Sequence, residues 1–171
     1  MKEKEIRPKK LFNKFLYLAE KDIKKYFKGK KTKLKCVACK SNGEFTFIKN
    51  NFSYYLCSKC KTLYANPRHK EKAFINYYTE SSSIKFLANT LYKKTKEARR
   101  KKIWLPKARI IISKLKKNKN YTFVDIGGGY GSFAEEILKY KKKAVVIEPS
   151  PFMARECRKR GLVVIEKFLE K

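Results

Sequence analysis

The chain has 171 residues, of which 43% are hydrophobic and 14% aromatic, and this content excludes a disordered chain. Lys and Arg number 45 against 15 Asp and Glu, a formal net charge of +30 that attracts polyanions such as nucleic acid. Lysine greatly outnumbers arginine and is spread along the whole chain, which favours a solvated surface over dedicated nucleic-acid recognition, because arginine is preferred for bidentate contacts.

The first predicted element is an amphipathic helix over residues 7–28, where apolar side chains recur at helical spacing until Gly29. The helix either packs on its own protein, which we favour, or lies on an anionic membrane. The N-terminus lacks the sustained apolar region of a signal peptide, and no apolar run approaches the roughly 18 residues that a membrane span needs. We therefore expect a cytoplasmic protein without a membrane span.

Four of the five cysteines stand in two C-x2-C pairs, Cys36 with Cys39 and Cys57 with Cys60. The 17 residues between the pairs, 40–56, fall within the spacing of zinc sites. Four thiolates fill every position of tetrahedral Zn²⁺ and leave none for an activated water, so the predicted zinc is structural. Two disulfides are the alternative, which a reducing compartment disfavours.

Between the cysteine pairs lie two aromatic-rich strand candidates, 45–48 and 52–56, which together with the pairs predict a zinc ribbon hairpin. Nearby lysines should lower the pKa of the ligand thiols; they are Lys33, Lys35, Lys40, Lys59 and Lys61. Two other side chains are less suited to the site: we expect Cys157 to be a packing thiol and His69 to be a surface residue beside the ribbon.

After the ribbon, residues 71–118 predict helices with breaks at 81–83 and at Pro106. Three short β-rich runs follow, separated by two helical stretches: 121–126, 144–148 and 162–165. This order is the opening β-α-β-α-β half of a doubly wound sheet, so the fold class is α/β. The four predicted segments are a helical extension (1–30), a zinc ribbon (31–70), a helical connector (71–118) and a partial ligand-binding α/β domain (119–171).

A glycine-rich turn follows the first of these strands, where residues 124–131 read VDIGGGYG and form the pattern D-x-G-x-G-x-G. The dinucleotide fingerprint G-x-G-x-x-G would need glycine at Ser132, so the pattern favours a methyl donor over NAD. Amides that open the next helix can meet the donor carboxylate, Asp125 can accept from its ammonium group, and Glu148 can accept from the ribose hydroxyls. A tight connection without a ligand is the alternative. The predicted donor-site residues are Asp125, Gly127, Gly128, Gly129, Gly131 and Glu148.

From about residue 34 to 171, the chain resembles class I S-adenosylmethionine-dependent methyltransferases with an N-terminal zinc ribbon, such as deoxysugar C-methyltransferases and related proteins of surface-polysaccharide clusters. The matching features are the two cysteine pairs, the glycine-rich turn, Asn66-Pro67-Arg68, Tyr77-Tyr78 and the basic run around Arg99-Arg100. The resemblance implies a Rossmann-like sheet, the donor site named above, and methyl transfer to a small acceptor such as a sugar nucleotide. It also suggests that Tyr77 or Tyr78 lines the acceptor pocket.

In that family the adenine-contacting loop and the general base lie largely beyond the third strand, so no catalytic base can be named here and the chain is expected to be a truncated form. The strand at 121–126 would then have an open apolar edge, which favours self-association. Two other functions remain: an RNA methyltransferase in which the ribbon and the lysines bind phosphates, and a non-catalytic remnant that binds only zinc.

Overall fold

The computed structural model describes residues 3–115 and 119–169. The parts of the predicted segments at 1–2, 116–118 and 170–171 lie outside the described residues. The chain forms two compact units of mixed helix and sheet, here called unit 1 (Met1–Ala19 and Tyr78–Lys171) and unit 2 (Glu20–Tyr77). Two helices contribute residues to both units: α2 (Lys9–Tyr26) and α3 (Glu71–Glu80). In the described part of the chain, no helix has the length and apolar character needed to cross a membrane.

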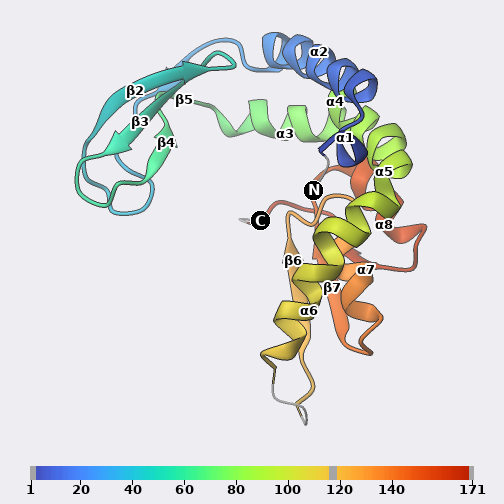
Figure 1. The fold of residues 1–171 in the computed structure, drawn as a ribbon. Coiled ribbons are helices and arrows are strands. Elements are labelled where there is room, and N and C mark those ends of the chain that lie inside the picture. Colours follow the sequence, from blue (N-terminus) through green and yellow to red (C-terminus); the bar gives the residue numbers. More distant parts are fainter. Residues whose placement is uncertain (1–2, 116–118, 170–171) are drawn as a thin grey trace. The chain divides into compact units, whose positions relative to one another are not determined.

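Unit 2 is built on a three-stranded antiparallel sheet in the order β2-β3-β4, drawn in teal and green in Figure 1. The strands of this unit are β1 (Lys31–Thr32), β2 (Gly43–Lys49), β3 (Phe52–Cys57), β4 (Leu63–Ala65) and β5 (Arg68–His69). The two predicted strands are present as β2 and β3. The sequence did not indicate β4 or the short β1–β5 pair.

An aromatic cluster around Phe27 fills the interior of unit 2 near the end of α2. The ring centroid of Phe27 lies 5.0 Å from those of Phe52 and Phe74 and 5.5 Å from that of His69. His69 is 5% exposed, so the prediction of a surface residue was wrong. Burial lowers the pKa of His69, and the charge of Lys31 lowers it further, which keeps the imidazole neutral in this apolar setting.

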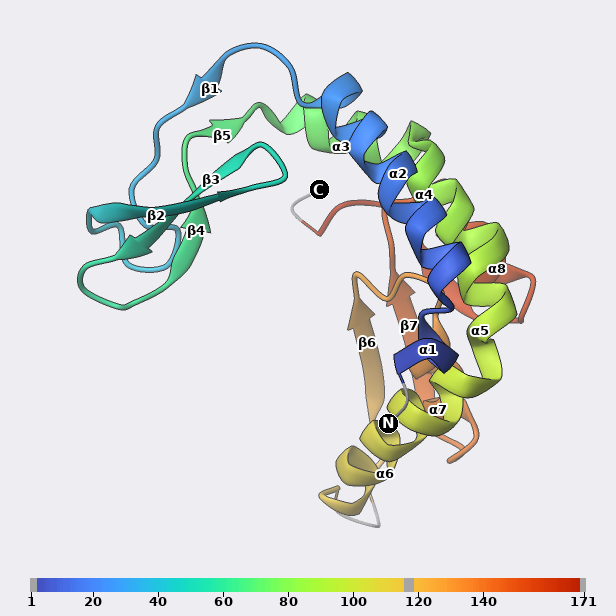
Figure 2. The same ribbon diagram turned by 45° about the horizontal axis from the view of Figure 1, so that its top comes forward.

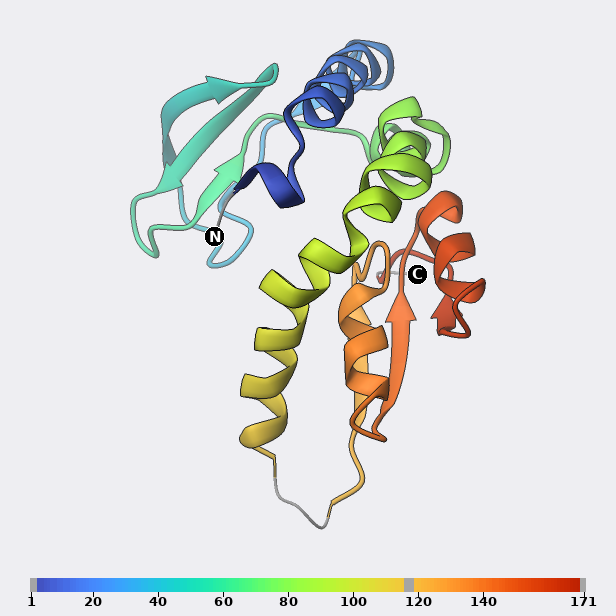
Figure 3. The ribbon, with the colours of Figure 1, turned by 45° about the vertical axis from the view of Figure 1, so that its right-hand side comes forward.

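Unit 1 contains an unbroken helical rod from Ser82 to Ser113, visible as the green-to-yellow coil in Figure 3. Its segments are α4 (Ser82–Phe86), η1 (Leu87–Leu91), α5 (Tyr92–Arg99), η2 (Arg100–Trp104) and α6 (Leu105–Ser113), of which η1 and η2 are π-helical. The predicted boundary at 81–83 is the start of the rod, where the Ser81 hydroxyl accepts the Ile84 N–H.

The predicted break at Pro106 is absent, because the rod continues through this residue in α6. The π-helical turn η2 precedes the proline, and its last hydrogen bond runs from Leu105 N–H to Arg100 O. Pro106 then stands in the first turn of α6, where a missing backbone N–H is tolerated. The remaining helices of unit 1 are α1 (Glu3–Ile6), α7 (Ser132–Leu138) and α8 (Pro151–Arg158).

The second sheet is parallel and has the order β6-β7-β8, with β6 (Thr122–Ile126), β7 (Lys143–Ile147) and β8 (Val163–Ile165). Figure 2 shows β6 and β7 running side by side in one direction. The three predicted runs are therefore strands, and α7 and α8 connect them in the predicted β-α-β-α-β order. Within this sheet β6 is an edge strand.

Among the described residues, the helices that pack on the parallel sheet cover one of its faces. Phe123, Ala144, Val146 and Val164 pack in one cluster with side chains from α6, α7 and α8. Both crossovers run in the same direction across the sheet, and crossovers of one hand then place their helices on one face. The opposite face, here called the bare face, consists of Val124, Ile126, Val145, Ile147, Val163 and Ile165.

An ion-pair cluster joins the rod to α7 and centres on two adjacent carboxylates. Glu135 pairs with Lys96 at 2.8 Å and with Arg160 at 2.8 Å. Glu136, whose side chain is 1% exposed, accepts from Arg100 at 2.7 Å and also from Lys139. Arg100, part of the basic run in the sequence, thus neutralises a buried charge inside unit 1.

Candidate metal centre and glycine-rich cleft

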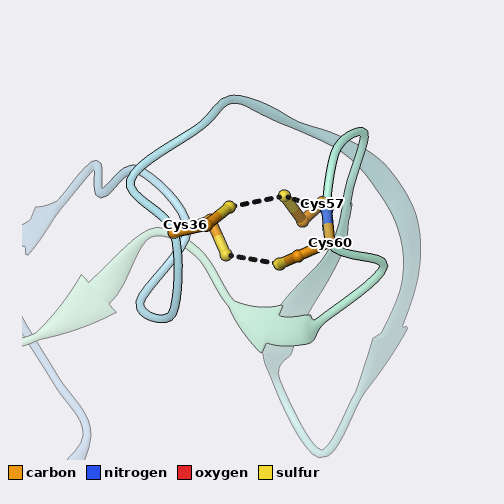
Figure 4. Close-up of side chains that lie close together, drawn as sticks. Cys36, Cys57 and Cys60 are labelled. Carbon is orange, nitrogen blue, oxygen red and sulfur yellow. Dashed lines mark hydrogen bonds between the residues drawn. The ribbon is translucent and has the colours of Figure 1, made fainter.

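The four cysteines of the two C-x2-C pairs meet in unit 2, and their sulfur atoms all lie within 4.8 Å of one another. Sγ of Cys36 is 3.5 Å from Sγ of Cys60, and Sγ of Cys39 is 3.5 Å from Sγ of Cys57. In Figure 4 the labelled Cys57 and Cys60 face Cys36 across a small gap. A disulfide would need about 2.05 Å between sulfurs, so the geometry is that of four free thiols positioned to bind one metal ion.

The backbone repeats itself at the two cysteine pairs. Cys36 N–H donates to Ser41 O at 2.8 Å and Lys40 N–H donates to Cys36 O at 2.9 Å; the equivalent bonds at the second pair join Cys57 to Thr62 at 2.9 Å and Lys61 to Cys57 at 3.2 Å.

Lys40 and Lys61 occupy equivalent places in these turns and both have left-handed backbones, with φ of 62° and 59°. This conformation costs a non-glycine residue roughly 1–2 kcal/mol. Its occurrence at both places indicates that the two turns are shaped to aim their sulfurs at a common point.

Hydrogen bonds, rather than the neighbouring lysines, tune the thiols. Bonds from Ser41 lower the pKa of the Cys39 thiol to about 6, and bonds from Thr62 lower the pKa of Cys60. A backbone bond from Cys60 favours the Cys57 thiolate, but burial and the adjacent sulfurs outweigh it and raise the pKa of Cys57. The two lowered values favour the thiolate form that metals bind.

A tyrosine closes one side of the cysteine cluster. Tyr64 is 5% exposed and packs on Cys36 and Cys57. A Cβ atom at Gly43 would lie 2.7 Å from the Tyr64 hydroxyl, so only glycine leaves room for this ring. The Asn-Pro-Arg segment follows β4, and there the buried Asn66 accepts the Leu34 N–H at 2.8 Å through its side chain. Asn66 therefore positions the chain that leads into the first cysteine turn.

In unit 1, the glycine-rich turn lies at the carboxyl ends of β6 and β7. Gly127 N–H donates to Ile147 O at 2.8 Å, and Gly129 N–H donates to the Glu148 carboxylate at 2.8 Å. The other oxygen of Glu148 accepts the Ser150 N–H at 2.9 Å. Two predicted donor-site features that are 19 residues apart in sequence, the turn and Glu148, are thus joined by one hydrogen bond.

The positions in the turn need glycine for different structural reasons. A Cβ atom at Gly131 would lie 2.5 Å from Leu162 Cδ1 and 2.7 Å from Cys157 Sγ, and one at Gly128 would lie 2.8 Å from Val146 Cγ1. These two glycines allow close packing. At Gly129 the nearest atom to a Cβ would be Gly127 O at 4.0 Å, and Gly127 has no neighbour within 4 Å. The turn therefore presents open backbone at Gly127 and Gly129.

Two clefts border this turn. The larger, about 350 Å³, is lined by the Asp125 carboxylate, Gly127, Phe133 and the side chains of α6, including Lys107. The smaller, about 170 Å³, lies over Gly129 and is lined by Tyr92, Arg99 and Ser132. Trp104 borders both clefts, and its buried indole N–H has no hydrogen-bond partner among the described residues.

Sequence reasoning missed Trp104, Tyr92 and Phe133, because their place at the turn depends on how the rod packs on α7. One signal was available: Trp104 is the only tryptophan, and it stands two residues before Pro106.

Glu148 is buried and Asp125 is partly buried. Burial raises the pKa of Asp125, although a hydrogen bond from Ala134 N–H opposes this. Burial also raises the pKa of Glu148; its two backbone bonds oppose the shift, and the charge of Asp125 adds to it. Both carboxylates would be stabilised by a bound cation or hydroxyl donor.

The other residues of the resemblance have separate places. Tyr77 belongs to the aromatic cluster of unit 2, where its ring centroid lies 5.4 Å from that of Phe27. Tyr78 belongs to unit 1, where its ring packs edge-on against Phe168 at 6.0 Å. Burial raises the pKa of Tyr78, and the charge of Glu148 contributes, which places Tyr78 within electrostatic range of Glu148.

Cys157 is fully buried in α8 and donates to Gly129 O at 3.2 Å, so it belongs to unit 1 and is not part of the cysteine cluster of unit 2.

Comparison of the chain with protein-family models found no match, and comparison with curated proteins found no relative.

Proposed function

We propose that the chain binds S-adenosylmethionine at the glycine-rich turn and transfers its methyl group to a small acceptor such as a sugar nucleotide, with one structural zinc held by the four cysteines. The main support for the donor site is the hydrogen bond between Gly129 N–H and the Glu148 side chain, because it joins the turn to the carboxylate that follows the neighbouring strand. In open parallel sheets, ligands bind at the carboxyl ends of the strands, where this junction lies.

Several features fit the donor. The space at Gly127 and Gly129 lets a ligand approach the backbone, and each oxygen of Glu148 keeps a lone pair after accepting one N–H. Asp125, which lines the larger cleft, would accept from an ammonium group, and Glu148 from ribose hydroxyls. The unpaired indole N–H of Trp104 would gain an acceptor.

Bound S-adenosylmethionine would supply an electrophilic methyl group. The residues of this chain would then bind the donor, fix its orientation and keep water away. The Rossmann-like assignment of the parallel sheet is part of this proposal. Nothing in the described residues singles out a catalytic base.

Zinc fits the cysteine cluster. Zn–S bonds of about 2.3 Å in a tetrahedron put neighbouring sulfurs about 3.8 Å apart. The separations here, between 3.5 and 4.8 Å, bracket that value. Because sulfur fills all four positions, the metal would stabilise unit 2 and take no part in methyl transfer.

Isothermal titration calorimetry with S-adenosylmethionine tests the donor site. The Gly129→Ala variant places a Cβ in the smaller cleft without a clash inside the protein, so we expect it to weaken binding by about tenfold or more. Gly161→Ala is the matched control, because Gly161 also has a positive φ, of 74°, and open space, but lines neither cleft. Absence of binding heat with the wild-type chain would refute the donor site and leave the zinc-only function.

A further inference from the structure

We infer that unit 2 binds single-stranded nucleic acid, with one unpaired base in an aromatic cleft beside the cysteine cluster and the phosphates on surrounding lysines. This inference is independent of the methyl-donor site, which lies in unit 1. The cleft has a volume of about 350 Å³, within the range of small-molecule sites. Its walls include the rings of Phe52, Tyr54, Tyr64 and Phe74 and the guanidinium of Arg68.

The aromatic walls are held in place by other rings. Phe52 and Phe74 both pack edge-on against the buried Phe27, with centroid distances of 5.0 Å. Tyr54 stacks on Phe47 across the β2–β3 pair, at 5.0 Å and an interplanar angle of 21°. Rings fixed in this way lose little conformational entropy when a flat ligand inserts between them.

Arg68 adds a second planar group to the cleft. Its Cζ atom lies 4.9 Å from the Phe74 ring centroid, and the side chain is exposed at the rim. A guanidinium beside aromatic faces can stack on a base and reach a phosphate at the same time. A purely apolar ligand would offer no partner for the charge of this guanidinium.

The charge of unit 2 is predominantly positive. Its sequence, residues 20–77, has 15 Lys and Arg against four acidic residues, Glu20, Asp22, Glu44 and Glu71. The basic side chains between residues 28 and 70 are all exposed: Lys28, Lys30, Lys31, Lys33, Lys35, Lys40, Lys49, Lys59, Lys61, Arg68 and Lys70. Dispersed lysines alone favour a solvated surface, but a positively charged unit that also holds a fixed aromatic cleft matches a polyanion that carries flat π-faces. Single strands are bound by this combination, whereas the bases of a duplex are already stacked.

Quenching of 2-aminopurine fluorescence detects base stacking directly. The probe is an oligonucleotide of about 12 nucleotides with one central 2-aminopurine, prepared as RNA, as DNA and as a duplex. In about 0.2 M salt, where phosphate contacts alone are weak, we expect the wild-type protein to quench a single strand. Quenching of both single strands would show that the sugar does not matter for binding, and quenching of RNA alone would show that it does. Either result supports the inference.

Two variants remove rings without changing charge. Tyr54→Leu and Phe74→Leu should each weaken binding of the single strand by about 5- to 20-fold, with an unchanged slope of log affinity against log salt. Phe74 lies on α3 and Tyr54 on β3, so the two effects do not share one packing defect. Phe45→Leu is the matched control: its ring is 56% exposed on β2 but does not line the cleft. Zinc content and far-UV circular dichroism verify folding of each variant.

The inference is overturned if the wild type binds without quenching. It is also overturned if Phe45→Leu weakens binding as much as Tyr54→Leu, since binding would then follow exposed rings and charge in general.

Discussion

Replacing Cys36 with serine is expected to abolish zinc binding and to unfold unit 2. Cys36 is fully buried, and its sulfur belongs to the four-cysteine cluster of unit 2. Structural zinc contributes about 10–16 kcal/mol of apparent folding free energy in zinc-finger peptides, so loss of a ligand should leave unit 2 without a stable fold. Metal analysis should fall from one zinc per chain to almost none.

Limited trypsin digestion locates the damage, because unit 2 is rich in lysine. We expect rapid cleavage within residues 20–77 of the Cys36→Ser variant. Cys157→Ser is the control: this cysteine is equally buried but lies in α8, so the variant should keep one zinc per chain. A wild-type protein purified under reducing conditions with far less than one zinc would contradict the metal site.

Removal of the Glu136 carboxylate should destabilise unit 1. In Glu136→Ala, Arg100 and Lys139 lose the buried carboxylate that they share. Their own side chains are 28% and 47% exposed, so no buried charge is left unpaired, and the loss is that of hydrogen bonds between charged groups, about 2 kcal/mol. Trp104 is the only tryptophan and lies in the same rod as Arg100, so its fluorescence reports on this unit. The urea midpoint should fall by about 1 M or more.

Glu97→Gln provides the comparison for this prediction. Glu97 also pairs with Arg100, at 3.5 Å, but its side chain is 67% exposed. Exposed pairs contribute less than about 1 kcal/mol, so this variant should unfold close to the wild-type midpoint. Equal shifts for the two variants would mean that the cluster is worth no more than a surface ion pair.

The best sequence predictions rested on local patterns. Two cysteines separated by two residues fit a single turn, so the spacing of each pair indicated how its sulfurs would be presented. The β-rich runs that became β6, β7 and β8 were located to within one residue at each end, because apolar runs bounded by turns are a strong strand signal. The strands β1, β4 and β5 have two or three residues each, too few for any periodicity.

The errors arose where tertiary packing decides. His69 is buried because Phe27 and Phe52, far away in sequence, enclose its ring. The rod passes Pro106 because a π-helical turn precedes it, and such turns have no reliable sequence pattern. Likewise, the order D-x-G-x-G-x-G predicted open backbone but could not show that Gly131 is required by Leu162 and Cys157.

The bare face of the parallel sheet has a practical consequence for handling the protein. Val124 is 53% exposed and Val163 62% exposed on this face, an unusual state for a parallel sheet. Copies of a chain with net charge +30 repel one another strongly at low ionic strength, and this repulsion opposes association through the bare face. At about 1 M salt the Debye length shrinks to about 3 Å, and the repulsion disappears. Light scattering should therefore rise with ionic strength. Concentrated solutions of the protein should aggregate least in buffers of low salt concentration.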